Sequence, residues 1–161
     1  MHTHVAPKRA SKLLLVVSVR ERLAATIELR RLYASLEASF DARTLERDAG
    51  LPRSMLVRLT EDEGRHGELL RRALLVLGAS VLPSELEPTA ATDLPRSLAQ
   101  ELRAILFAKL QDVDGWETLT TRARELGYTD LEHQFRRAAM DEQVHVTHIR
   151  QSLTQAADSA T

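Results

Sequence analysis

The sequence predicts an all-α protein: a four-helix bundle whose helices run up, down, down and up. Long segments rich in Leu, Ala, Arg and Glu carry apolar residues at helical spacing. One long connection separates the second and third of these segments, and short turns separate the others. Only a long connection allows two successive helices to run in the same direction. With 161 residues, the chain suits one domain with a substantial core.

The first two helices are marked by their ends. After a tail of residues 1–10, the first helix is expected from about Ser11, a possible N-cap, to Asp41, because this segment lacks Gly and Pro. The second helix is expected from about Pro52 to Gly78. Proline is tolerated in the first turn of a helix, and glycine suits the C-terminal cap.

Residues 79–94 form the long connection. A helix of roughly 26 residues is about 40 Å long, and sixteen extended residues span about 55 Å, so this segment can cross the bundle lengthwise. The remaining elements are two helices, from near Asp93 or Pro95 to Gly127 and from Thr129 or Asp130 to about Gln155, and a tail of residues 156–161.

Composition excludes several classes of function. The chain has no Cys, so it has no disulfide, no thiolate nucleophile and no cysteine-based metal site. A formal net charge of −1 provides no overall field for nucleic acid or anionic lipid. The apolar run at 13–19 is too short for a membrane helix or a secretory signal. We therefore expect a cytoplasmic protein that binds neither nucleic acid nor membranes.

Two Glu-x-x-His pairs interrupt the apolar stripes. Alternating steps of three and four residues from Leu56 give a core-facing stripe broken only by Glu63 and His66. The same steps along the last helix meet Glu142 and His145. A buried carboxylate is costly unless it is paired or bound to a cation, so this repetition requires an explanation.

Metal ligation would remove that cost. Glu and His one turn apart project in the same direction, so two such helices facing each other present two carboxylates and two imidazoles to one place. One carboxylate from each remaining helix, Glu28 and Asp112, would complete six side-chain ligands. Two divalent ions would neutralise the four carboxylates.

With these residues, the chain resembles the ferritin-like superfamily of di-iron or di-manganese carboxylate bundles over residues 11–155. Such bundles use one Glu from each of two helices and Glu-x-x-His from each of the other two. Glu28 followed by Tyr33 also resembles the first-helix Glu and nearby Tyr of rubrerythrin-like and bacterioferritin-like proteins. The third helix departs from this pattern, because its best-placed carboxylate is Asp112, and Lys109 lies one turn earlier. Two metal ions, one metal ion, or no metal with a buried ion-pair network around Lys109 all remain open.

The resemblance implies a metal-binding protein that oxidises ferrous iron or reduces oxygen or hydrogen peroxide at a dinuclear site. The cofactor would be iron, with two ions, or manganese. The resemblance implies no organic cofactor and no catalytic residues beyond the metal ligands. The implied ligands are Glu28, Glu63, His66, Asp112, Glu142 and His145. The alternative is a non-catalytic, stress-related or structural bundle with a degenerate metal site. Nothing after the fourth helix resembles the fifth helix of cage-forming ferritins, so we expect a homodimer.

Overall fold

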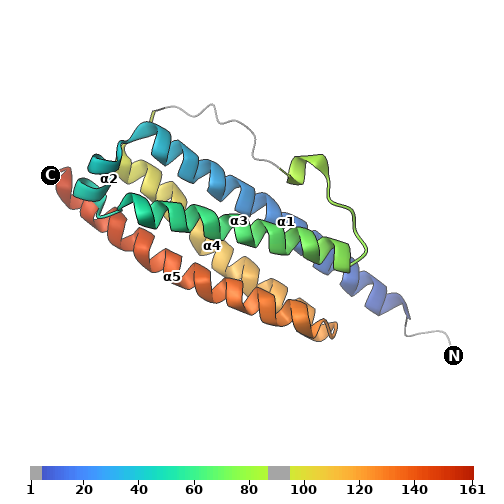
Figure 1. Ribbon diagram of the computed structural model, residues 1–161. Helices are drawn as coiled ribbons and strands as arrows, with labels where there is room; N and C mark the ends of the chain where they lie inside the picture. The colour runs from blue at the N-terminus through green and yellow to red at the C-terminus, as the bar shows by residue number, and fades with distance from the viewer. Residues whose placement is uncertain (1–4, 87–94) are drawn as a thin grey trace.

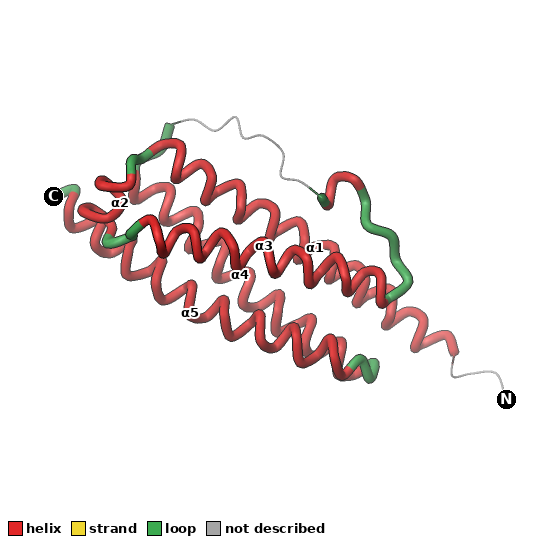
Figure 2. Tube along the Cα trace, in the orientation of Figure 1, coloured by secondary structure: helices red, strands yellow, loops and turns green. Residues whose placement is uncertain are grey.

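The structure is a computed structural model that describes residues 5–86 and 95–161 (Figure 1). Within those residues the secondary structure is helical and includes no strand (Figure 2). The α-helices are α1 (Val5–Ser39), α2 (Ala42–Ala49), α3 (Arg53–Val76), α4 (Leu98–Glu125) and α5 (Thr129–Ser159). The prediction of an all-α bundle is therefore confirmed.

The four long helices run up, down, down and up, as the sequence predicted. In Figure 1, α1 and α5 run toward one end of the bundle, and α3 and α4 run toward the other. The end of α3 and the start of α4 consequently lie at opposite ends of the molecule. Their connection includes a short 3-10 helix, η1 (Pro83–Glu85), and residues 87–94, including the possible helix start at Asp93, lie outside the described residues.

A short helix, α2, was not predicted. It fills the connection between the first two long helices, where the sequence indicated only a turn. The Asp41 side chain caps α2 by accepting a hydrogen bond from the Thr44 backbone N–H at 2.8 Å. Gly50 ends the helix in the left-handed conformation at φ 57°, which glycine adopts without steric cost.

The terminal helices are longer than expected. α1 already includes residues 5–10, and α5 continues through residues 156–159, segments that we expected to be tails. α4 begins later than expected, at Leu98, because Ser97 accepts a hydrogen bond from the Gln100 backbone N–H and forms a capping box with that residue.

Two apolar clusters fill the bundle, one toward each end. The first contains Leu15, Val19, Leu23, Leu70, Leu74, Trp116, Leu119 and Phe135. The second contains Leu29, Tyr33, Leu36, Leu56, Leu59, Leu102, Ile105 and Ile149. On each long helix, buried polar residues lie between the two clusters. This polar layer contains Arg22 and Thr26 on α1, Glu63 and His66 on α3, Lys109 and Asp112 on α4, and Glu142 and His145 on α5.

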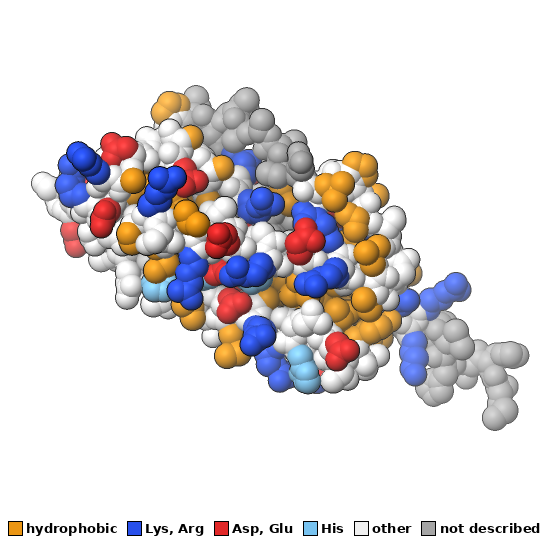
Figure 3. Space-filling view, viewed as in Figure 1, with side chains coloured by type: hydrophobic (Ala, Val, Ile, Leu, Met, Phe, Trp, Pro, Cys, Tyr) orange, Lys and Arg blue, Asp and Glu red, His pale blue; other side chains and the backbone are white. Residues whose placement is uncertain are grey.

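The surface is mixed in charge. Lys and Arg side chains lie among Asp and Glu side chains on the face shown in Figure 3, in keeping with a formal net charge of −1. In the described part of the chain, no helix has an apolar stretch long enough to cross a bilayer.

Candidate metal centre

The two Glu-x-x-His pairs meet in the polar layer. α3 and α5 run antiparallel and project Glu63, His66, Glu142 and His145 into the interior between the two apolar clusters. Both carboxylates are fully buried, and both imidazoles are 5% exposed. The structure therefore brings these four predicted ligands together, as the register of the stripes indicated.

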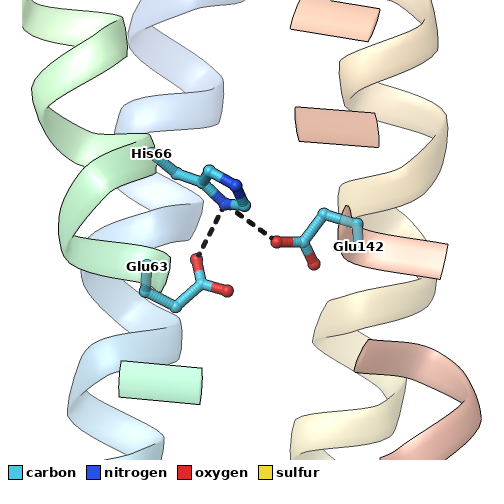
Figure 4. Close-up of side chains that lie close together, drawn as sticks. All are labelled: Glu63, His66 and Glu142. Atoms are coloured by element: carbon cyan, nitrogen blue, oxygen red, sulfur yellow. Dashed lines mark ion pairs between the residues drawn. The ribbon is translucent and has the colours of Figure 1, made fainter. Parts of the chain in front are cut away.

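Three of these side chains form a group that could hold one metal ion. His66 Nδ1 lies 3.0 Å from Glu142 Oε1 and 3.9 Å from Glu63 Oε2 (Figure 4). Donor atoms bound to one transition metal at about 2.0–2.2 Å lie roughly 3–4 Å apart. None of the three atoms has a hydrogen-bond partner of normal geometry among the described residues. The Glu63, His66 and Glu142 group thus fits a single ion in both donor type and spacing.

Lys109 lies on the other side of the same two carboxylates. Its fully buried ammonium donates hydrogen bonds to Glu63 Oε1 and, at 2.8 Å, to Glu142 Oε2. The Nζ atom is also 3.2 Å from His145 Nδ1 and 5.7 Å from the centre of the Tyr33 ring. Each carboxylate therefore turns one oxygen toward His66 and the other toward Lys109.

Opposite charges keep these groups ionised. Burial would lower the pKa of Lys109, but Glu63 and other neighbours, including Glu142, raise it above its ordinary value. Burial would likewise lower the pKa of His66, yet its contacts with Glu142 and Glu63 raise that pKa to about 9. Burial would raise the pKa of Glu142, but His145, His66 and Lys109 hold it well below the ordinary value. Without metal, an ammonium and an imidazolium therefore balance the two carboxylates at neutral pH.

Asp112 is buried in the layer but belongs to a different contact. Its Oδ1 lies 3.0 Å from Arg22 Nη1, and that guanidinium also donates to the Gln111 backbone oxygen at 2.9 Å. Gly115 leaves room for Arg22, because a Cβ at this position would overlap the guanidinium. Burial and the nearby Glu142 raise the pKa of Asp112 to about 8, although Arg22 opposes the rise. Asp112 is not part of the candidate metal group found among the described residues.

Glu28 lies away from the centre, in contrast to our expectation. Its side chain is 51% exposed and accepts hydrogen bonds from Arg31, one of them at 2.8 Å. Each residue of an α-helix turns it by about 100°, so Glu28 points about 160° away from Thr26, the buried neighbour on α1. The structure therefore does not bring the expected α1 carboxylate to the other ligands.

The sequence analysis missed Asp62 and Arg22. Asp62 Oδ2 is 2.9 Å from His145 Nε2, and the carboxylate also pairs with Arg65. A carboxylate on the outer nitrogen fixes the orientation and tautomer of a ligating imidazole. Asp62 also borders a surface pocket of about 140 Å³ between α3 and α5, which reaches His145 from solvent. Asp62 lies four residues before His66 on the same helix, and this spacing could have indicated it from the sequence.

Comparisons with known proteins support the fold. No protein-family model and no curated protein matches the chain. Among solved structures, the chain is similar to "ferritin like, diiron-carboxylate proteins from Bacillus anthracis str. Ames", with a TM-score of 0.73 and 17% sequence identity over 89% of this chain and 97% of that chain. This similarity confirms the predicted ferritin-like bundle fold.

Proposed function

We propose that this protein binds a divalent transition metal ion, iron or manganese, through Glu63, His66 and Glu142. The observation that carries the proposal is the convergence of their three buried donor atoms, none of which makes a hydrogen bond of normal geometry in the described part of the chain. Such atoms are costly in a protein interior unless they bind something. Mixed carboxylate and imidazole donors suit iron and manganese. The ferritin-like fold, shared with a protein whose title names a diiron-carboxylate centre, supports the same assignment.

We further propose that bound ferrous iron is oxidised by oxygen or hydrogen peroxide. The iron would supply a redox-active ion that can give up an electron at neutral pH. Glu63 and Glu142 would neutralise its charge, and His66 would bind through Nδ1 after losing the proton that it holds in the metal-free state. The apolar clusters on both sides of the layer limit water access, and the pocket beside Asp62 reaches His145, which borders the centre.

Metal titration of the untagged, chelator-treated protein tests the proposal. We expect ferrous or manganous ion to bind without oxygen, and we expect near-ultraviolet absorbance to rise when air is admitted to the ferrous form. A Glu63→Gln, Glu142→Gln double variant should lose binding. Glu28→Gln, the same change at an exposed position, should not. Equal affinity of the double variant and the wild type would refute the assigned ligands. Binding without oxidation beyond the buffer rate would refute only the redox step.

A non-catalytic bundle is the second candidate, and one observation favours it. Lys109 contacts both fully buried carboxylates and, together with the protonated His66, balances their charge, so the polar layer can exist without metal. In that case the ion-pair network would be the final state of the centre, and the helices would serve a structural role. Absence of metal binding in the titration above would select this candidate.

A further inference from the structure

Glu63 and Glu142 lie between two cation positions, one beside His66 and the other at Lys109 Nζ. On one side, Glu63 Oε2 and Glu142 Oε1 lie near His66 Nδ1. On the other side, Glu63 Oε1 lies 4.0 Å from His145 Nδ1. The shortest contact of that nitrogen with Glu142, at 3.6 Å, is to Oε1, the oxygen that also faces His66. The first position has two carboxylate oxygens and one imidazole nitrogen that make no hydrogen bond of normal geometry in the described chain. The second has donors of the same types, but Lys109 Nζ lies among them.

We propose that Lys109 permanently fills the second cation position with its own ammonium and thereby limits the protein to one metal ion per chain. This inference rests on the proposed metal-binding function. Nζ contacts one oxygen of each carboxylate and the imidazole nitrogen, which are the donors that a second ion would need. Because the ammonium is attached to α4 by a fully buried four-carbon chain, it does not diffuse away when metal is added.

The charge of the layer supports this stoichiometry. The fully buried carboxylates are Glu63, Glu142 and Asp112, and the buried side-chain cations beside them are Lys109 and Arg22. When Asp112 is ionised and the imidazoles are neutral, three carboxylates against two cations leave one negative charge, which one divalent ion more than neutralises. At neutral pH the raised pKa of Asp112 favours its protonated form, and the two cations then already balance Glu63 and Glu142. A second divalent ion would add further positive charge to an interior that solvates ions poorly.

Lys109 also explains how the layer exists before metal arrives. Without its ammonium, Glu63 and Glu142 would face each other as buried carboxylates with only the side chains of His66 and His145 beside them. Paired groups of this kind are strongly destabilised when one partner is removed. Lys109 therefore has two roles: it stabilises the metal-free bundle, and it determines how many ions the centre accepts.

Counting manganous ions bound per chain tests the inference, by equilibrium dialysis with circular dichroism as a check on folding. The wild type should bind one ion. Lys109→Ala, which opens the second position without adding a ligand, should bind two ions at once and show the spin-coupled electron paramagnetic resonance signal of neighbouring manganese ions. Propylammonium, which replaces the missing side-chain ammonium, should return this variant to one ion.

The possible failures are distinguishable. A wild type that binds no ion overturns the proposed function itself. A wild type that binds two ions, or a folded Lys109→Ala that still binds one, overturns the role of Lys109 and leaves metal binding intact. If Lys109→Ala does not fold without metal, Lys109→Glu provides a second test. Manganese should restore the helical circular dichroism signal of Lys109→Glu when two ions are bound per chain. Recovery of that signal with one bound ion, or no recovery in either Lys109 variant, counts against the proposal.

Discussion

Raising the pH should destabilise the metal-free protein through His66. Burial alone would lower the pKa of this imidazole, but Glu142 and Glu63 raise it from 6.5 to about 9 in the folded state. Because the folded pKa is the higher one, the stabilisation is complete below about pH 6.5 and is lost as the pH rises through about 9. At 1.36 kcal/mol per pKa unit, the protonated His66 contributes about 3 kcal/mol.

Urea unfolding of chelator-treated protein at intervals between pH 6 and pH 10 measures this contribution. The pKa of Asp112 is also raised, to about 8, so ionisation of Asp112 lowers the stability of the wild type as the pH rises toward 8. The contribution of His66 must therefore be measured as the difference between the wild type and a variant that lacks this imidazole. The difference between the wild type and His66→Gln should shrink by about 3 kcal/mol across the range. His133→Gln, a change at an exposed histidine, serves as the control and should show no such trend. A difference that stays constant with pH would refute the pairing of His66 with the two carboxylates.

Three further predictions follow from the same contacts. Manganese affinity should rise about tenfold per pH unit up to about pH 9, because the metal competes with the proton on His66. Isothermal titration calorimetry at several pH values measures this affinity, and an affinity that does not change with pH would exclude His66 as a ligand. Glu63→Ala should abolish manganese binding while Glu28→Ala leaves it unchanged, and equal losses would argue against the assigned group. Gly115→Ala should destabilise the protein by about 2 kcal/mol because the new Cβ displaces Arg22 from its ion pair. With Arg22→Ala already present, the same change should stabilise by about 1 kcal/mol in urea unfolding, because alanine favours the helix, and further destabilisation would refute the overlap.

The stripes on α3 and α5 could be read from the sequence because each has one clear register. Steps of three and four residues from Leu56 and Phe135 lead through apolar positions to the Glu-x-x-His pairs, all of which are buried. Helix direction followed from the length of the middle connection. These features depend on local spacing and chain length, which the sequence contains directly.

On α1, Glu28 was expected to be a ligand, but it lies outside the buried register of that helix. Alternating steps of four and three give the stripe that is buried in the structure: Leu15, Val19, Arg22, Thr26, Leu29, Tyr33 and Leu36. That spacing would have excluded Glu28 and found Arg22. The sequence could not show that Arg22 reaches Asp112, since this contact depends on how α1 and α4 lie against each other and on the space above Gly115.

The position of Lys109 also required the structure. Its place on a core-facing stripe indicated burial, but three outcomes for the centre remained possible. The contacts of Nζ with both carboxylates and with His145 show which side of Glu63 and Glu142 the ammonium occupies. They leave the side facing His66 as the place where three donor atoms converge.

Anomalous X-ray diffraction from crystals grown with manganous ion, or with ferrous ion under nitrogen, would locate the metal ions bound in the polar layer. We expect one strong anomalous peak per chain, from an ion bound by Glu63, His66 and Glu142. Lys109 Nζ should still contact Glu63 Oε1 and Glu142 Oε2. Failure to find a peak in the polar layer would contradict the metal site. A pair of peaks with the Lys109 side chain displaced would contradict its role as the second cation.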